Sequence, residues 1–223
     1  MSDRNPDAGG IGVIGLGRFG CHLAESLTAV GREVLAIDSD ARKVQRWSAK
    51  LDQVAQADST DEEALRQLDV GELGRVVVAI GASVQASVLT VLALVELGVP
   101  QIWARATSAQ HAKILSSVGA HRVIFPEAET GERLAHLIAS RMLDFAEFGD
   151  AFAVAKVRVP EALAGHPTSE VRQLDRYGIR VIGIRPPGEK RFRYVADGLA
   201  LDRDSTLIIE GTIDKVQEFS TLS

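Results

Sequence analysis

The sequence of 223 residues contains one cysteine, Cys21. A single thiol cannot form a disulfide within the chain or supply a multi-cysteine metal site, and such sparse use of cysteine fits a reducing cytoplasm. Basic residues are not in excess either, because 30 acidic residues outnumber 25 lysines and arginines and the formal net charge is −5. We therefore expect no nucleic-acid-binding surface.

Long hydrophobic runs are also missing. The most apolar stretch, residues 76–97, is interrupted by glycine, serine and glutamine, and no uninterrupted run reaches the roughly 20 residues of a membrane span. Residues 1–10 are polar and lack the apolar segment of a signal peptide. Hydrophobic residues still make up 46% of the chain, enough for an ordinary core. The sequence thus predicts a cytoplasmic globular protein that reaches a membrane only through a partner.

Short apolar runs alternate with helical patterns over the first part of the chain. Strands are predicted at residues 11–14, 34–37, 53–57, 76–80, 101–104 and 122–125, and helices at 19–30, 41–49, 61–68, 83–97 and 108–117. Six strands alternating with helices indicate an α/β fold with a Rossmann-like parallel six-stranded sheet, covered by helices on both faces. Ligands bind such sheets at the carboxyl ends of the strands.

The pattern changes after the sixth strand. Residues 129–145 read as a long helix that ends near Gly149, and strands at 152–159, 179–184, 192–195 and 206–209 follow with helices at 169–177 and 213–219. We therefore predict two domains. The first, residues 10–148, would bind a nucleotide and include the long helix, and the second, residues 149–223, would be a small α+β domain.

A glycine-rich turn follows the first strand and opens the first helix. In the sequence Gly15-Leu16-Gly17-Arg18-Phe19-Gly20, Gly15 allows the tight turn, Gly17 lets the backbone approach a phosphate, and Gly20 lets helix and strand pack closely. The first N–H groups of the helix then face the phosphate. The alternative is that the glycines serve packing alone.

Asp38 ends the second strand, 18 residues after Gly20, near the spacing of an acid that binds ribose. Its carboxylate would accept hydrogen bonds from both ribose hydroxyls and would repel a 2′-phosphate, which argues against NADP. The alternative role is a helix cap. Arg18, inside the turn, could hold a terminal phosphate through paired hydrogen bonds, or it could be a solvated surface arginine.

The ends of the strands supply the other candidates. The predicted nucleotide contacts are Gly15, Gly17, Arg18, Phe19, Gly20, Asp38, Ser39, Asp58, Ser59, Thr60, Ile80, Gly81, Ala82 and Arg105.

These motifs resemble the KtrA/TrkA family, the cytosolic RCK (regulator of potassium conductance) or KTN subunits of bacterial potassium uptake systems. The resemblance covers residues 11–219, and it is carried by residues 15–20, 34–38, 76–82, 85–87 and 119–127. It implies a TrkA-N domain followed by a TrkA-C domain. The long helix at 129–145 would be the family's crossover helix, and residues 149–223 would be its regulatory domain. Dimers would form through the crossover helix and assemble as an octameric ring on a membrane potassium-translocating subunit of the KtrB/TrkH kind.

The resemblance also implies the ligands. ATP and ADP would bind the N-terminal domains, and NAD(H) binds some members. Arg18 would contact the ATP γ-phosphate across the dimer, and Glu127 would lie near Mg²⁺, Ca²⁺ or Na⁺ at that interface. One carboxylate cannot hold a Ca²⁺ or Mg²⁺ ion alone, since these ions take about six oxygens, so an ordinary capping role for Glu127 stays open.

The C-terminal domain of related proteins can bind cyclic di-AMP. The matching region here is residues 174–185 with Pro186 and Pro187, where Arg176, Ile179 and Ile182 are candidate contacts. The same residues would serve a plain dimer interface.

The leading hypothesis is a nucleotide-gated regulatory subunit without enzymatic turnover. The alternative is an NAD(H)-binding redox sensor or a dehydrogenase-like protein. Against an enzyme, the second domain offers one histidine, His166, and no acid–base pair suited to hydride transfer.

Overall fold

The computed structural model describes residues 9–149, 151–167, 178–195 and 201–222. The chain divides between residues 128 and 129 into two compact units. Each unit has its own hydrophobic core and is described by itself. Within the described residues, no helix is both long and apolar enough to cross a bilayer.

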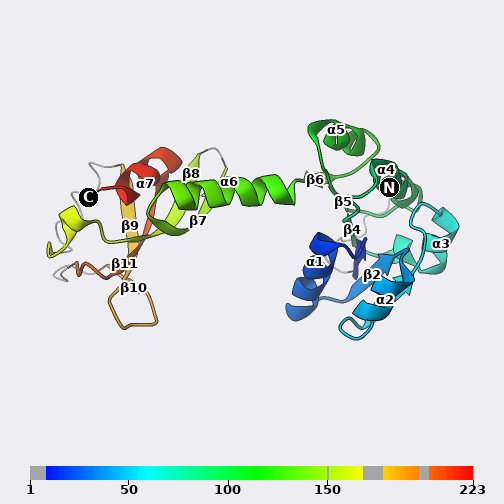
Figure 1. The fold of residues 1–223 in the computed structure, drawn as a ribbon, viewed down its shortest axis with the longest axis horizontal. Helices are drawn as coiled ribbons and strands as arrows, with labels where there is room; N and C mark the ends of the chain where they lie inside the picture. Colours follow the sequence, from blue (N-terminus) through cyan, green and yellow to red (C-terminus); the bar gives the residue numbers. More distant parts are fainter. Residues whose placement is uncertain (1–8, 150, 168–177, 196–200, 223) are drawn as a thin grey trace. The chain divides into compact units, whose positions relative to one another are not determined.

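The first unit is built on a six-stranded parallel sheet with the strand order β3-β2-β1-β4-β5-β6 (Figure 1). The strands are β1 (Ile11–Ile14), β2 (Val34–Asp38), β3 (Gln53–Gln56), β4 (Arg75–Val78), β5 (Ile102–Arg105) and β6 (Arg122–Ile124). The helices are α1 (Arg18–Ala29), α2 (Ala41–Trp47), α3 (Glu62–Gln67), α4 (Val84–Glu96) and α5 (Ala109–Ser117), with a 3₁₀ turn at Val70–Glu72. The predicted Rossmann-like architecture is confirmed.

Successive residues of the central strands point to opposite faces of this sheet. Val13 and Ala36 pack in a core that α1 and α2 cover, whereas Ile14 and Ile37 pack with side chains of α3, α4 and α5. Residues buried on both faces explain why the strands read as continuous apolar runs. The chain runs outward from β1 to β3 and then returns to β4 on the other side of β1. This reversal of strand order lies at the carboxyl end of β1, where such sheets bind ligands.

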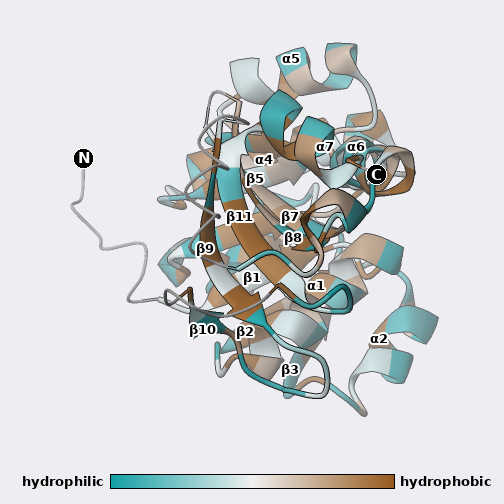
Figure 2. Cartoon of the chain, turned by 90° about the vertical axis from the view of Figure 1, so that its left-hand side faces the viewer, coloured by the Kyte–Doolittle hydropathy of each residue, from teal (hydrophilic) through white to brown (hydrophobic). Residues whose placement is uncertain are grey.

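The second unit contains a five-stranded sheet with the order β10-β9-β11-β8-β7 and antiparallel pairing throughout. Its elements are β7 (Met142–Phe148), β8 (Phe152–Arg158), a 3₁₀ turn at Glu161–Leu163, β9 (Ile179–Arg185), β10 (Arg193–Tyr194), β11 (Thr206–Thr212) and α7 (Ile213–Ser220). Hydrophobic residues run along β9 and β11 (Figure 2). Phe219 of α7 is fully buried with them, so an α+β unit is present as expected. The predicted helix at 169–177 lies outside the described residues.

The crossover helix is shorter than predicted. Helix α6 spans Pro126–Ala139, and the end of the expected helix is instead strand β7, which pairs with β8. The reason is a bulge between Met142 and Asp144. It puts Met142 and Phe145, three residues apart, on the same buried face, and a spacing of three imitates a helix. The predicted domain boundary between residues 148 and 149 assigns the crossover helix to the first domain. It stays a prediction.

Candidate nucleotide-binding site

A pocket of about 400 Å³ lies at the carboxyl edge of the parallel sheet. Of the predicted contacts, those that line it are Gly15, Gly17, Asp38, Ser39, Asp58, Ser59, Thr60, Ile80, Gly81, Ala82 and Arg105. The lining also includes residues that sequence reasoning did not single out, which are Ile14, Lys43, Ala79, Ser83 and Ala86. Arg18, Phe19, Gly20 and Glu127 are not part of the lining. The strand ends therefore meet in one concave site, as the topology predicts.

The three glycines of the turn differ in what holds them. Gly15 has a positive φ of 98°, which favours glycine. A Cβ on Gly20 would lie 1.9 Å from the Gly15 carbonyl oxygen, whereas a Cβ on Gly17 would meet nothing within 4 Å. Backbone conformation therefore accounts for Gly15, and packing accounts for Gly20. Neither accounts for Gly17, and the open space beside Gly17 is where a phosphate would approach the backbone.

Helix α1 begins directly after this glycine. Gly17 occupies the N-cap position and has no side chain to cap the helix, so the first-turn N–H groups of Arg18, Phe19 and Gly20 are available to an anion. The Arg18 side chain is exposed and the Phe19 side chain is half-buried. In this region the protein offers a phosphate mainly backbone N–H groups and the positive end of the helix dipole.

Asp38 is almost fully buried, with 6% of its surface exposed. Its Oδ2 accepts the N–H of Leu16 at 2.7 Å, which ties the glycine turn to the end of β2. Its Oδ1 accepts the N–H of Asp40 at 2.9 Å. The carboxylate thus has a structural role at the start of α2 besides its place in the pocket lining.

Lys43 adds a cation to this corner. It lies in the first turn of α2, and its Nζ is 2.9 Å from Oδ2 of Asp38. The sequence analysis predicted a helix here but did not single out this residue. The signal that could have found it is a lysine in the first helical turn after a ribose-binding acid, where its side chain can reach the carboxyl edge of the sheet.

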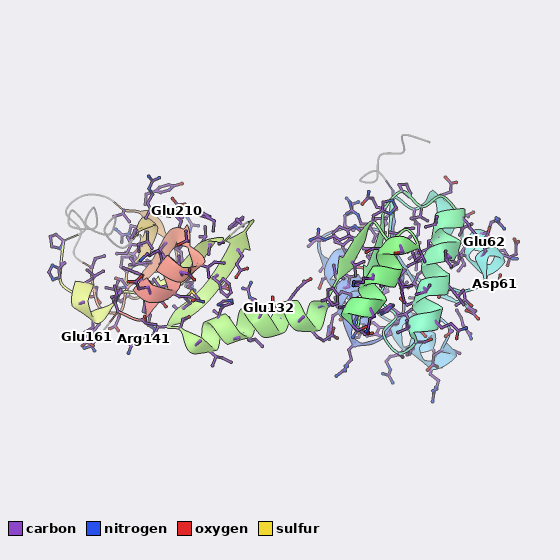
Figure 3. All side chains as sticks on the ribbon, turned by 90° about the horizontal axis from the view of Figure 1, so that it is seen from above. Asp61, Glu62, Glu132, Arg141, Glu161 and Glu210 are labelled. Carbon is purple, nitrogen blue, oxygen red and sulfur yellow. The ribbon has the colours of Figure 1, made fainter. Side chains whose placement is uncertain are left out.

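The end of β3 contributes a hydrogen-bonded turn. Oδ1 of Asp58 accepts the Thr60 N–H at 3.0 Å and the Thr60 hydroxyl at 2.8 Å, and these two bonds hold the pKa of Asp58 below its ordinary value. The Ser59 hydroxyl is bound to the buried Thr90 hydroxyl of α4 at 2.8 Å. Asp61 then caps α3 (Figure 3). The Ser59 side chain therefore anchors the turn, while Asp58 keeps a charged carboxylate at the pocket.

Arg105, at the end of β5, lies against Gly81 and Glu127. A Cβ on Gly81 would come within 2.1 Å of Nη1 of Arg105. Nη2 of Arg105 is 2.5 Å from Oε1 of Glu127, and Nε donates to Oε2 at 3.4 Å. Burial works to raise the pKa of Glu127, but the hydrogen bond from Arg105 and the charges of Arg105 and Arg18 outweigh it and lower that pKa.

Glu127 was predicted to lie near a metal ion. In this structure its carboxylate is paired with Arg105. The described residues contain no group of three or more histidine, cysteine or acidic side chains that could hold a metal ion. A cation at Glu127 would therefore need ligands beyond such side chains of the described residues, such as backbone oxygens, water or groups of a second chain.

The candidate contacts for cyclic di-AMP are placed only in part. Arg176 lies outside the described residues. Ile179 is 3% exposed and belongs to the core of the second unit, so its side chain is not available to a ligand on the surface. Ile182 is half-buried.

The following features define a Rossmann-type domain of the nucleotide-binding class. They are a doubly wound parallel sheet, a glycine turn before a helix, an acid at the end of β2 and a pocket at the reversal of strand order. Residues 11–126 match the family model of the TrkA-N domain. The chain belongs to the TrkA-N family, as the resemblance predicted.

Two relatives match almost the whole chain. Ktr system potassium uptake protein C of Bacillus subtilis is 33% identical over 208 residues, covering 93% of this chain and 94% of the relative. Ktr system potassium uptake protein A of the same organism is 31% identical over 208 residues, covering 93% of each chain. The chain is thus homologous to Ktr potassium uptake proteins over both units.

Solved structures agree on the fold. The RCK domain of GsuK aligns with a TM-score of 0.53 at 22% identity, covering 97% of this chain and 47% of that one. The GsuK channel bound to NAD aligns with a TM-score of 0.50 at 23% identity, covering 94% of this chain and 37% of that one. At this level of identity the likeness concerns the fold.

Proposed function

We propose that the chain is a regulatory subunit of a potassium uptake system and that its first unit senses adenine nucleotides without turning them over. One observation carries the proposal. The phosphate end of the site combines the uncapped start of α1 and Arg105 in the pocket lining with a second arginine, Arg18, that is exposed and outside the lining. Both Ktr relatives are named as potassium uptake proteins, which supports the transport role.

Arg18 supports a preference between ATP and ADP. Within the described residues its side chain makes no hydrogen bond or ion pair, although its charge acts on Glu127, so its guanidinium can bind a phosphate through paired hydrogen bonds. We infer that it reaches the γ-phosphate of a nucleotide held by a second copy. ADP lacks that group, so the two nucleotides differ in affinity for the paired state. Gating requires such a difference.

Assembly follows from the same proposal. Helix α6 has no buried residue, and its Leu134 and Ile138 are 50% and 82% exposed. Apolar side chains on a solvent-facing helix favour burial against another chain. We infer a dimer through α6, an octameric ring of four dimers, and docking on a membrane potassium-translocating subunit at the cytoplasmic face. Glu127 would bind Mg²⁺, Ca²⁺ or Na⁺ at the dimer interface, and the second unit would take cyclic di-AMP.

Calorimetry with ATP, ADP and NADH tests the proposal, together with native mass spectrometry for the oligomer. Arg18→Ala is expected to weaken ATP binding by about ten- to a hundredfold, the worth of charged hydrogen bonds to a phosphate, and to leave ADP binding within about threefold. Arg46→Ala is the matched control, because Arg46 is an exposed arginine of α2 outside the pocket lining. The proposal would be refuted if the protein stayed monomeric and bound the three nucleotides with equal affinity.

A second candidate is an NAD(H)-binding redox sensor. It is favoured by the pocket at the strand reversal, which suits a dinucleotide, and by the NAD bound to the GsuK channel. The same titrations separate the two candidates. A redox sensor would bind NADH more tightly than ATP, and Arg18→Ala would leave that order unchanged.

A further inference from the structure

The Asp38 carboxylate has little capacity left for a ligand. A carboxylate offers about four acceptor positions on its two oxygens. Oδ2 already accepts from Leu16 N–H at 2.7 Å and from Lys43 Nζ at 2.9 Å, and Oδ1 accepts from Asp40 N–H at 2.9 Å. One position on Oδ1 remains. Asp38 can therefore accept a single ribose hydroxyl, not the pair that the sequence suggested, unless Lys43 moves away.

Lys43 is the charged partner of Asp38 in the pocket lining. Its ammonium has three N–H donors, and one of them is used by Asp38. Its side chain is 41% exposed and lines the pocket, so the remaining donors are accessible to a bound nucleotide. A ribose that places one hydroxyl on Oδ1 of Asp38 presents its other oxygen to Lys43.

The positive charge of Lys43 also changes the expected preference between a ribose with free hydroxyls and a ribose with a 2′-phosphate. The prediction that Asp38 repels a 2′-phosphate assumed an unpaired carboxylate. With the ammonium at 2.9 Å, the two charges cancel at the ribose end, and a phosphate there meets a cation that offers hydrogen bonds. Arg42, which directly precedes Lys43 in the sequence, is bound to Asp40 instead. Lys43 is thus the cation that faces this position.

We propose that Lys43 determines specificity at the ribose end of the pocket and admits adenine nucleotides that carry a phosphate on the ribose 2′ oxygen beside those with free hydroxyls. The proposal rests on the proposed function, because it requires an adenine nucleotide in this pocket.

The test is calorimetric competition against ADP with the full-length protein. AMP and adenosine 2′,5′-bisphosphate serve as competitors because they differ only in the 2′-phosphate. The wild type is expected to bind the two within about tenfold of each other. Lys43→Met keeps most of the side-chain stem but loses the charge. It is expected to weaken binding of the bisphosphate by about ten- to a hundredfold, which is the contribution of charged hydrogen bonds. The affinity for AMP should stay within about threefold of the wild-type value.

Lys43→Arg is the matched control and is expected to retain bisphosphate binding, since the charge is kept. The ratio of the two affinities is the readout, because a variant that only disturbs α2 would weaken both ligands together. An unchanged ratio in Lys43→Met, or a wild type that rejects the bisphosphate more than about a hundredfold, overturns the proposal while ADP binding still supports the proposed function. A wild type that binds no adenine nucleotide overturns both.

Discussion

The Arg105 guanidinium is held by the Glu127 carboxylate, with Nη2 of Arg105 2.5 Å from Oε1 of Glu127. Arg105 comes from the end of β5 and lines the pocket, while Glu127 stands in the first turn of α6 outside the lining. A phosphate that entered this end of the pocket would compete with Glu127 for the same guanidinium. If the proposed function holds, nucleotide binding and the pairing of Glu127 are expected to be linked through Arg105.

This competition predicts the effect of removing the carboxylate. Glu127→Gln is expected to tighten ADP binding in metal-free buffer by about two- to fivefold, the size of a solvent-screened ion pair, because Arg105 is released. The measurement is calorimetric titration with ADP. Glu132→Gln, an exposed residue of the same helix (Figure 3), is the control and should change nothing. Weaker binding in Glu127→Gln would show that Glu127 assists the nucleotide rather than competing with it.

The lowered pKa of Glu127 gives a pH dependence. A carboxyl whose pKa is lower in the folded state contributes stability above its unfolded value of 4.5, and this contribution is lost as the pH falls through the folded value. The difference in unfolding free energy between wild type and Glu127→Gln is expected to stay constant from about pH 8 to 5 and to shrink below 4.5. Urea denaturation at a series of pH values measures it. A difference that grows on acidification contradicts the pairing.

Two of the three glycines of the turn predict different outcomes. Gly20→Ala places a Cβ 1.9 Å from a backbone oxygen, so the turn has to shift and unfolding free energy should fall by about 2–4 kcal/mol. Gly17→Ala meets open space at an ordinary φ of −75°. It should cost less than about 1 kcal/mol but weaken ADP binding at least about tenfold.

Denaturation curves and calorimetry on both variants check this contrast. If Gly17→Ala binds ADP as the wild type does, Gly17 is not the point of phosphate approach.

The pairing of β7 with β8 predicts where the chain can be divided. A fragment of residues 10–148 carries β7 without its partner β8, and an unpaired strand edge promotes aggregation. A fragment ending at residue 139 omits β7. It is expected to remain dispersed under conditions in which the longer fragment aggregates, as measured by light scattering. Equal behaviour of the two fragments would favour a functional division at residues 148 and 149.

Much of the first unit could be predicted from the sequence because its strands are short, buried on both faces and separated by clear turn residues. The run at residues 76–80 shows this, since continuous apolar residues without a helical period leave little choice. The strand at 142–148 could not be predicted. Its bulge spaces the buried Met142 and Phe145 as a helix would, and only the pairing with β8 reveals the strand.

The candidate site, too, could be predicted only in part. Gly15, Asp38 and the strand ends could be located because motif and topology determine where they lie. The partners of Asp38 and Arg105 were not located. The place of Lys43 in the first helical turn after Asp38 brings it near that acid, but the contacts of Lys43 with Asp38 and of Arg105 with Glu127 depend on side-chain directions that spacing alone does not determine. The pair of Lys43 and Asp38 is what changes the expected selectivity of the pocket.

The contact between Gly20 and the Gly15 carbonyl has a mechanical consequence. With no room for even a methyl group between turn and helix, the first turn of α1 cannot move toward the Gly15 carbonyl. Gly15 directly follows β1, which is paired along its length with β2 and β4. A displacement of the start of α1 toward the sheet is therefore expected to displace the end of β1 in the middle of the sheet as well.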